Sequence, residues 1–102
     1  MTHGVLLPNV TDVVTPDFAA RLESLDYDTV WTGELWGTDA FVHLSHVAHH
    51  TDDVGLGTAI VNVFSRSPAV LAAAASTLQS TTDRELRLGV GASTPKAIED
   101  LH

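Results

Sequence analysis

The sequence predicts an α/β fold made of four strand–helix units, and three observations support this. Short apolar runs rich in β-branched residues, typical of strands covered on both faces, alternate with stretches of helical periodicity. Two expected helices begin at a capping residue followed by proline, at Thr15 and at Ser67. The strands are spaced by roughly 25–30 residues, close to the ~31 residues per unit of an eight-unit barrel.

The first unit combines a short buried strand at residues 5–7 with a helix that Thr15 caps. Phe18, Leu22 and Leu25 are spaced at i, i+4 and i+7, which places them in one apolar stripe. The stripe indicates a helix that packs on the sheet by one face.

The second unit has a strand at 29–32, a loop at 33–37 and a helix at 39–50. The expected buried face of this helix consists of three apolar residues: Phe41, Leu44 and Ala48. The opposite face carries three histidines: His43, His46 and His50. Their spacing could bind zinc, but no carboxylate lies within the set, so we expect a solvated or interface surface and no metal site.

The third unit is the most informative, because its strand at 54–62 contains Gly55 and Gly57. Glycine inside a strand usually marks a bulge or a close approach by other atoms. Asn62 ends this strand, and a helix follows from Pro68 to about residue 80. Arg66 precedes that helix and is expected to form a structural ion pair or to cap carbonyl groups.

The fourth unit has a strand at 85–91 and a helix expected at 96–102. A doubly wound sheet is the alternative to a barrel, but its nucleotide-binding form places Gly-x-Gly-x-x-Gly at the first strand-to-helix turn. Residues 7–11 contain no glycine, so we favour the N-terminal half of a TIM (β/α)8 barrel. Half a barrel leaves open sheet edges, and we therefore expect residues 1–102 to be a domain truncated at its C-terminus.

Composition narrows the function classes. The 102 residues include 13 acidic and 5 basic ones, for a formal net charge of −8, which disfavours nucleic acids and anionic membranes as partners. Lys96 is the one lysine, a bias that favours a high-salt cytoplasm over an ordinary acidic protein. Cysteine is absent, which excludes disulfides and thiolate chemistry. A cytoplasmic protein is expected, because no apolar stretch is long enough to span a bilayer.

Five motifs, in this order and spacing, resemble the N-terminal half of the luciferase-like monooxygenase family. They lie at residues 4–9, 28–34, 56–60, 66–68 and 88–95, and residues 98–102 resemble the same family. The resemblance is to the variant often linked to the deazaflavin coenzyme F420. It implies an eight-stranded barrel whose cofactor lies at the C-terminal ends of the strands, with phosphate-binding loops after the later strands. Homodimers through the second and third helices are implied as well.

The same resemblance implies roles for particular residues. Glu34 would face the reactive edge of the cofactor ring, as a catalytic residue that orients the ring or moves a proton. A bulge with a non-proline cis peptide between Ala59 and Ile60 would lie against the ring face. The implied cofactor-binding set is Ala59, Ile60, Asn62, Gly91 and Ser93.

Three functions therefore follow for the sequence. The first is hydride transfer between a deazaflavin coenzyme and a small organic substrate, with this chain holding half of the cofactor site. The second is an FMN-dependent monooxygenase of the same family. The third is a non-enzymatic half-barrel that acts as an interaction module.

Overall fold

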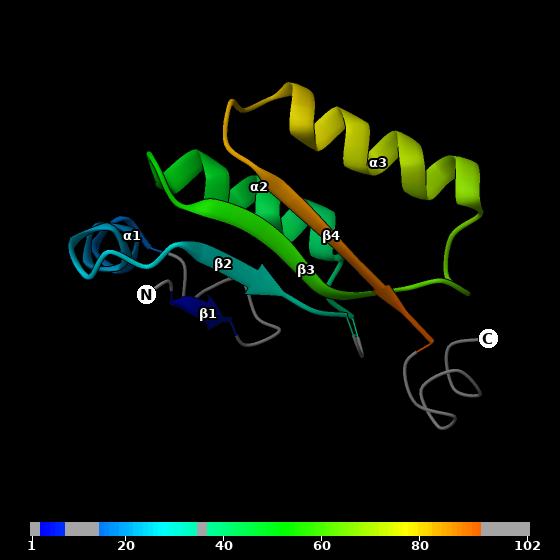
Figure 1. Cartoon of the computed structure of the whole chain (residues 1–102), viewed down its shortest axis with the longest axis horizontal. Coiled ribbons are helices and arrows are strands. Elements are labelled where there is room, and N and C mark those ends of the chain that lie inside the picture. Colours follow the sequence, from blue (N-terminus) through cyan, green and yellow to red (C-terminus); the bar gives the residue numbers. More distant parts are fainter. Residues whose placement is uncertain (1–2, 8–14, 35–36, 93–102) are drawn as a thin grey trace.

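The computed structural model describes residues 3–7, 15–34 and 37–92, which form a parallel sheet covered by helices (Figure 1). Its four strands are, in chain order, β1 (Gly4–Leu6), β2 (Thr29–Thr32), β3 (Gly55–Asn62) and β4 (Leu86–Gly91). The spatial order is β1-β2-β3-β4, and every neighbouring pair is parallel. This order confirms the predicted α/β fold and is consistent with half of a (β/α)8 barrel.

Two of the three helices begin where the capping residues Thr15 and Ser67 predicted, and the other begins at its expected position after Asp39. They are α1 (Pro16–Ser24), α2 (Ala40–His50) and α3 (Pro68–Ser80). The side chains of Thr15, Asp39 and Ser67 each accept a hydrogen bond from the N–H three residues later. Leu25, expected in the stripe of the first helix, is instead its exposed C-cap residue, since the chain turns at once through Asp26 at φ 58°. The helix predicted at 96–102 lies outside the described residues.

The helices make one layer on the sheet. α2 lies between α1 and α3 and packs on β2 and β3, whereas α3 packs on β4 (Figure 1). The core between the layers consists of buried aliphatic residues and Phe41. Its best-buried members come from β2, α2 and β3: Val30, Leu44, Val47, Leu56 and Val61.

The opposite face of the sheet carries the indole of Trp31. A Cβ atom added at Gly57 would lie 2.5 Å from this ring, and one added at Gly4 would lie 2.6 Å from it. Both glycines are therefore required for the indole to lie against the backbone of β1 and β3. For Gly57 this confirms the close approach that a glycine inside the strand predicted.

Arg84 joins the C-terminal end of α2 to the start of β3. Its guanidinium donates hydrogen bonds to the Thr51 hydroxyl at 2.5 Å, the Ala48 carbonyl at 2.6 Å and the Val54 carbonyl at 3.2 Å. A cation at the C-terminal end of a helix is favoured because the last carbonyls there lack helical partners. Arg84 thus has a structural role that sequence analysis did not identify.

The prediction that His43 lies on a solvated face is wrong. Its side chain is 1% exposed, and neither ring nitrogen has a hydrogen-bond partner. Phe41 and Leu44 of the predicted stripe are buried, but the buried face of α2 also includes Ala40 and Val47. His43 is one turn from each of these two. Burial, followed by the nearby charge of His46, lowers the pKa of His43.

Acid should therefore destabilise the fold through His43. With its pKa lowered in the folded state, the unfolded chain takes up a proton first as the pH falls below ~6.5, and stability falls with it. His43→Leu removes two unpartnered polar atoms, each of which costs about 1–3 kcal/mol when buried. We expect this variant to be more stable than the parent, by a margin that widens between pH 7 and pH 5.

The measurement is the urea midpoint of both proteins across that pH range. His49→Leu is the matched control, since His49 is exposed on the same helix. Equal loss of stability on acidification in the parent and in His43→Leu would contradict the assignment.

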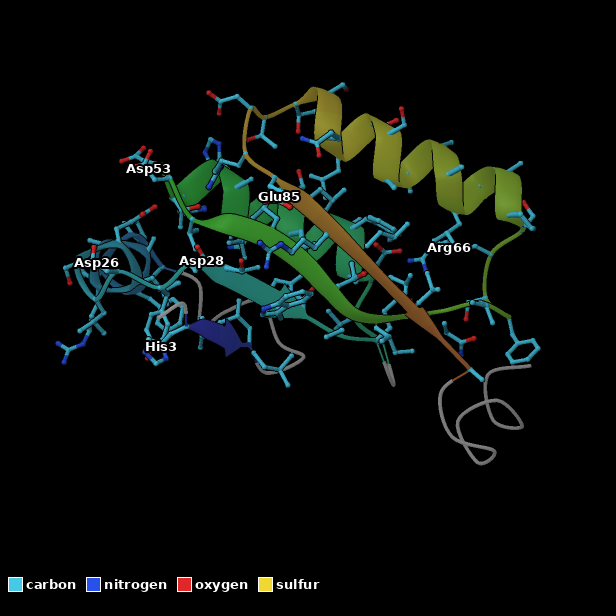
Figure 2. All side chains as sticks on the ribbon, viewed as in Figure 1. His3, Asp26, Asp28, Asp53, Arg66 and Glu85 are labelled. Atoms are coloured by element: carbon cyan, nitrogen blue, oxygen red, sulfur yellow. The ribbon has the colours of Figure 1, made fainter. Side chains whose placement is uncertain are left out.

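Charged residues lie at both ends of the sheet. Asp28 and Asp53 precede β2 and β3, at the end where the strands begin, whereas Arg66 follows β3 at the opposite end (Figure 2). In a parallel α/β sheet the C-terminal ends of the strands form the edge where ligands bind. None of the helices in the described ranges is long and apolar enough to cross a membrane.

Candidate functional site

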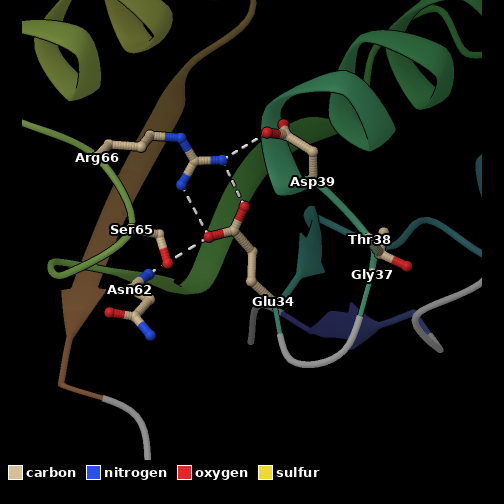
Figure 3. A pocket seen from close by; sticks show the side chains of 7 residues that line it. All are labelled: Glu34, Gly37, Thr38, Asp39, Asn62, Ser65 and Arg66. Carbon is tan, nitrogen blue, oxygen red and sulfur yellow. Dashed lines mark hydrogen bonds and ion pairs between the residues drawn. The ribbon is translucent and has the colours of Figure 1, made fainter. Parts of the chain in front are cut away.

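A pocket of about 430 Å³ lies at the C-terminal ends of β2 and β3 (Figure 3). Its walls come from the segment between β2 and α2 and from the segment between β3 and α3. The lining residues are short or polar: Glu34, Gly37, Thr38, Asp39, Asn62, Ser65 and Arg66. The pocket is thus at the edge of the sheet where sequence analysis expected a cofactor.

The Glu34 carboxylate accepts four hydrogen bonds in this pocket. Its Oε1 accepts from Arg66 Nη1 at 2.8 Å and from the Asn62 N–H at 3.4 Å. Its Oε2 accepts from Arg66 Nη2 at 2.5 Å and from the Ala40 N–H at 3.0 Å. The carboxylate therefore joins the end of β3 to the first turn of α2.

Arg66 is held from three sides. Besides its paired bonds to Glu34, its Nη2 donates to Asp39 Oδ2 at 2.6 Å. The guanidinium carbon also lies 5.0 Å from the centre of the Phe41 ring, within the range of a cation–π contact. The expected structural ion pair of Arg66 is confirmed, and we call the set of Glu34, Arg66 and Asp39 the clamp.

Electrostatics keep the clamp ionised. Burial opposes the charge on Glu34, but the bonds from Arg66 and Ala40 outweigh it, so the pKa of Glu34 is lowered. The pKa of Asp39 is lowered in the same way, by the Val42 N–H and Arg66 against burial. The bond to Glu34 is the main reason that the pKa of Arg66 is raised. With two carboxylates and one guanidinium, the clamp carries one net negative charge.

The middle of β3 contains the irregularity that the resemblance implied. The Ala59–Ile60 peptide is cis, and the pairing of β3 with β4 shifts register between Thr58 and Val61. Gly33 faces this segment, because a Cβ added there would lie 2.7 Å from the Ala59 carbonyl oxygen. The residue directly before Glu34 must therefore be small for β2 to pass the bulge.

Ala59 and Ile60 lie beside the pocket rather than in it. Leu56 is in the core, so strand alternation turns Gly57 and Ala59 to the face opposite the helices, and Ala59 is exposed there. The Ile60 side chain lies along β4, where its Cδ1 is 2.9 Å from the position of a Cβ added at Gly91. Together they form an open apolar surface next to the clamp.

The predicted site residues thus fall into two adjoining groups. Glu34 and Asn62 line the pocket, whereas Ala59, Ile60 and Gly91 form the apolar surface. Asn62 is buried, and its Oδ1 accepts from the Phe64 N–H at 2.7 Å, which fixes the turn after β3. Ser93 lies outside the described residues.

Three further residues belong to this site although the sequence did not predict it: Asp39, Phe41 and Gly33. Asp39 was readable as a helix cap, but its second oxygen bonds Arg66 across 27 residues of sequence, which no local pattern reveals. Among the described residues there is no group of three histidine, aspartate or glutamate side chains that could hold a metal ion.

The family model described as luciferase-like monooxygenase matches residues 13–102 of the chain. A protein of Mycobacterium tuberculosis that bears the provisional name coenzyme F420-dependent oxidoreductase is 36% identical over 83 residues. An uncharacterised protein of Mycobacterium bovis has the same identity over the same length. Each alignment covers 81% of this chain, and the chain spans 24% of the length of each relative.

Proposed function

Because this chain belongs to the luciferase-like monooxygenase family, we propose that the full-length protein containing it is a cytoplasmic deazaflavin-dependent oxidoreductase. The reaction would be hydride transfer between coenzyme F420 and a small organic substrate. The provisional name of the Mycobacterium tuberculosis relative supports the choice of cofactor. The observation that carries the proposal is the bulge at Ala59–Ile60, with Ala59 exposed, beside an ionised clamp whose Glu34 and Arg66 are partly buried.

The residues present fit a planar ring at the bulge. Ala59 is exposed and contributes one methyl group, Ile60 supplies an apolar wall, and Gly91 contributes no side chain. A flat, partly apolar ring can lie against such a surface without leaving many polar groups unpaired. A deazaflavin there would supply the hydride chemistry, and the chain would supply position and charge balance.

Glu34 is proposed to position the site rather than to move a proton. All four of its hydrogen bonds come from donors that it would have to leave in order to reach a substrate. Its lowered pKa also makes it a poor proton donor near neutral pH. Of the two roles that the resemblance implied, orientation is the one that this geometry supports.

An FMN-dependent monooxygenase is the second candidate, since the family description names a monooxygenase. Equilibrium titration of the full-length protein with F420 and with FMN, followed by cofactor fluorescence, separates the two. We expect F420 to bind at least ten times more tightly than FMN. Preference for FMN would favour the monooxygenase, and binding of neither would favour a non-enzymatic module.

We also propose that a second copy of the chain covers the groove between α2 and α3. This groove is lined mainly by apolar and small residues: Phe41, Val42, Ser45, Val70, Ala73, Ala74, Thr77, Leu78 and Thr81. Val42 is 68% exposed and Val70 is 55% exposed, which is unusual for apolar residues placed side by side. Burial of both side chains would favour association by removing this apolar surface from water.

The dimer is tested by light scattering during gel filtration. The double variant Val42→Asp, Val70→Asp should be monomeric at concentrations where the parent is dimeric. Leu25→Asp places the same charge on an exposed apolar residue of α1 and should leave the dimer intact. If the parent protein is already monomeric, the proposed dimer is wrong, and the proposed enzymatic function is unaffected.

A further inference from the structure

We propose that Arg66 is a positioning residue for cofactor binding: it fixes Glu34 between the ends of β2 and β3 and so holds the Ala59–Ile60 surface in place. This inference rests on the proposed function. Arg66 itself does not line the surface formed by Ala59 and Ile60; it acts through Glu34.

The geometry links the clamp to the bulge by short steps. Glu34 Oε1 accepts from Arg66 and from the Asn62 N–H, two residues after Ile60. On the other side, Gly33 directly precedes Glu34 and approaches the Ala59 carbonyl. Gly33 and Glu34 therefore contact the bulged strand at two points, Gly33 at the bulge itself and the Glu34 carboxylate just after it.

Arginine suits this place better than lysine. Its planar fork satisfies both Glu34 oxygens at once while the same Nη2 reaches Asp39, and its flat face lies against the Phe41 ring. The paired Glu34 and Arg66 side chains are each 12% exposed, so water offers little substitute if one partner is lost. Loss of Arg66 would leave Glu34 as a partly buried carboxylate without its paired cation.

The test measures F420 affinity of the full-length protein against pH for four variants. Arg66→Met should bind F420 at least tenfold more weakly at pH 7, and weaker still at pH 5, because Glu34 without Arg66 takes up a proton at higher pH. Arg66→Lys should recover part of the affinity. Arg21→Met, which removes an exposed arginine of α1, should bind as the parent does.

The double variant Glu34→Gln, Arg66→Met identifies Glu34 as the group through which Arg66 acts. It has no carboxylate at position 34 to protonate, and Asp39 loses Arg66 in both variants, so its affinity should change less between pH 7 and pH 5 than that of Arg66→Met and should match or exceed the affinity of Arg66→Met at pH 5. A double variant as dependent on pH as Arg66→Met would overturn the proposal.

The proposed function and the positioning role of Arg66 can be contradicted separately. If the parent binds F420 and Arg66→Met binds it equally tightly while remaining folded by circular dichroism, the positioning role is wrong and the proposed function stands. If the parent binds neither F420 nor FMN, the proposed function fails and the positioning role falls with it.

Discussion

Replacing Ala59 with tryptophan should abolish binding of the deazaflavin ring. Ala59 is exposed on the face opposite the helices, where its methyl group leaves the surface beside Ile60 open. An indole at this position would occupy the space in which the ring is proposed to lie. We expect the dissociation constant for F420 to rise at least a hundredfold, or about 2.8 kcal/mol at ~1.4 kcal/mol for each factor of ten.

The control for this variant is Ala20→Trp, which places the same side chain on an exposed position of α1. Both variants should keep the helical circular dichroism of the parent, since neither alanine belongs to the core. Titration by cofactor fluorescence gives the affinities. Parental affinity in Ala59→Trp would mean that the ring binds elsewhere and that β3 is only scaffold.

Replacing Arg84 with methionine should cause the largest loss of stability. The change removes the donor for the Ala48 and Val54 carbonyls and for the Thr51 hydroxyl. Hydrogen bonds from a charged donor contribute roughly 1.5–3 kcal/mol each and are not additive, so we expect a total loss of about 2–3 kcal/mol. The free energy of unfolding in urea measures it.

Arg87→Met is the matched substitution, because the side chain of Arg87 is half exposed and its partner Glu85 is more exposed still. Exposed ion pairs contribute little, so this variant should lose under about 1 kcal/mol. Equal losses in the two variants would show that the contacts of Arg84 do not stabilise the junction between α2 and β3.

Much of the fold was predictable because its signals are local. Capping residues at Thr15 and Ser67 marked helix starts, and short apolar runs marked all four strands. The buried face of α2 was less predictable, because Ala40 and Val47 were not recognised as part of it. A histidine at the edge of that face counts as polar in any periodicity argument, although the packing of α2 against the sheet and its neighbouring helices buries it.

Site residues were predictable where the resemblance to a family pointed to single positions. They were less predictable where a contact joins residues that are far apart in the sequence. The cis peptide at Ala59–Ile60 and the ion pair of Arg66 were both expected and are both present. The partner of Arg66 was not predictable, because Glu34 and Arg66 are 32 residues apart and meet only when β2 and β3 pair. Because Arg66 binds it through two hydrogen bonds, Glu34 is a carboxylate held in one position rather than a free acid at the end of a strand.

The most direct test of the central claim is a crystal structure of the full-length protein with F420 bound. We predict that the deazaflavin ring lies against Ala59 and Ile60, with the clamp of Glu34, Arg66 and Asp39 unchanged beside it. A ring bound away from β3, or a Glu34 carboxylate that has left Arg66 to contact the ring, would contradict the account.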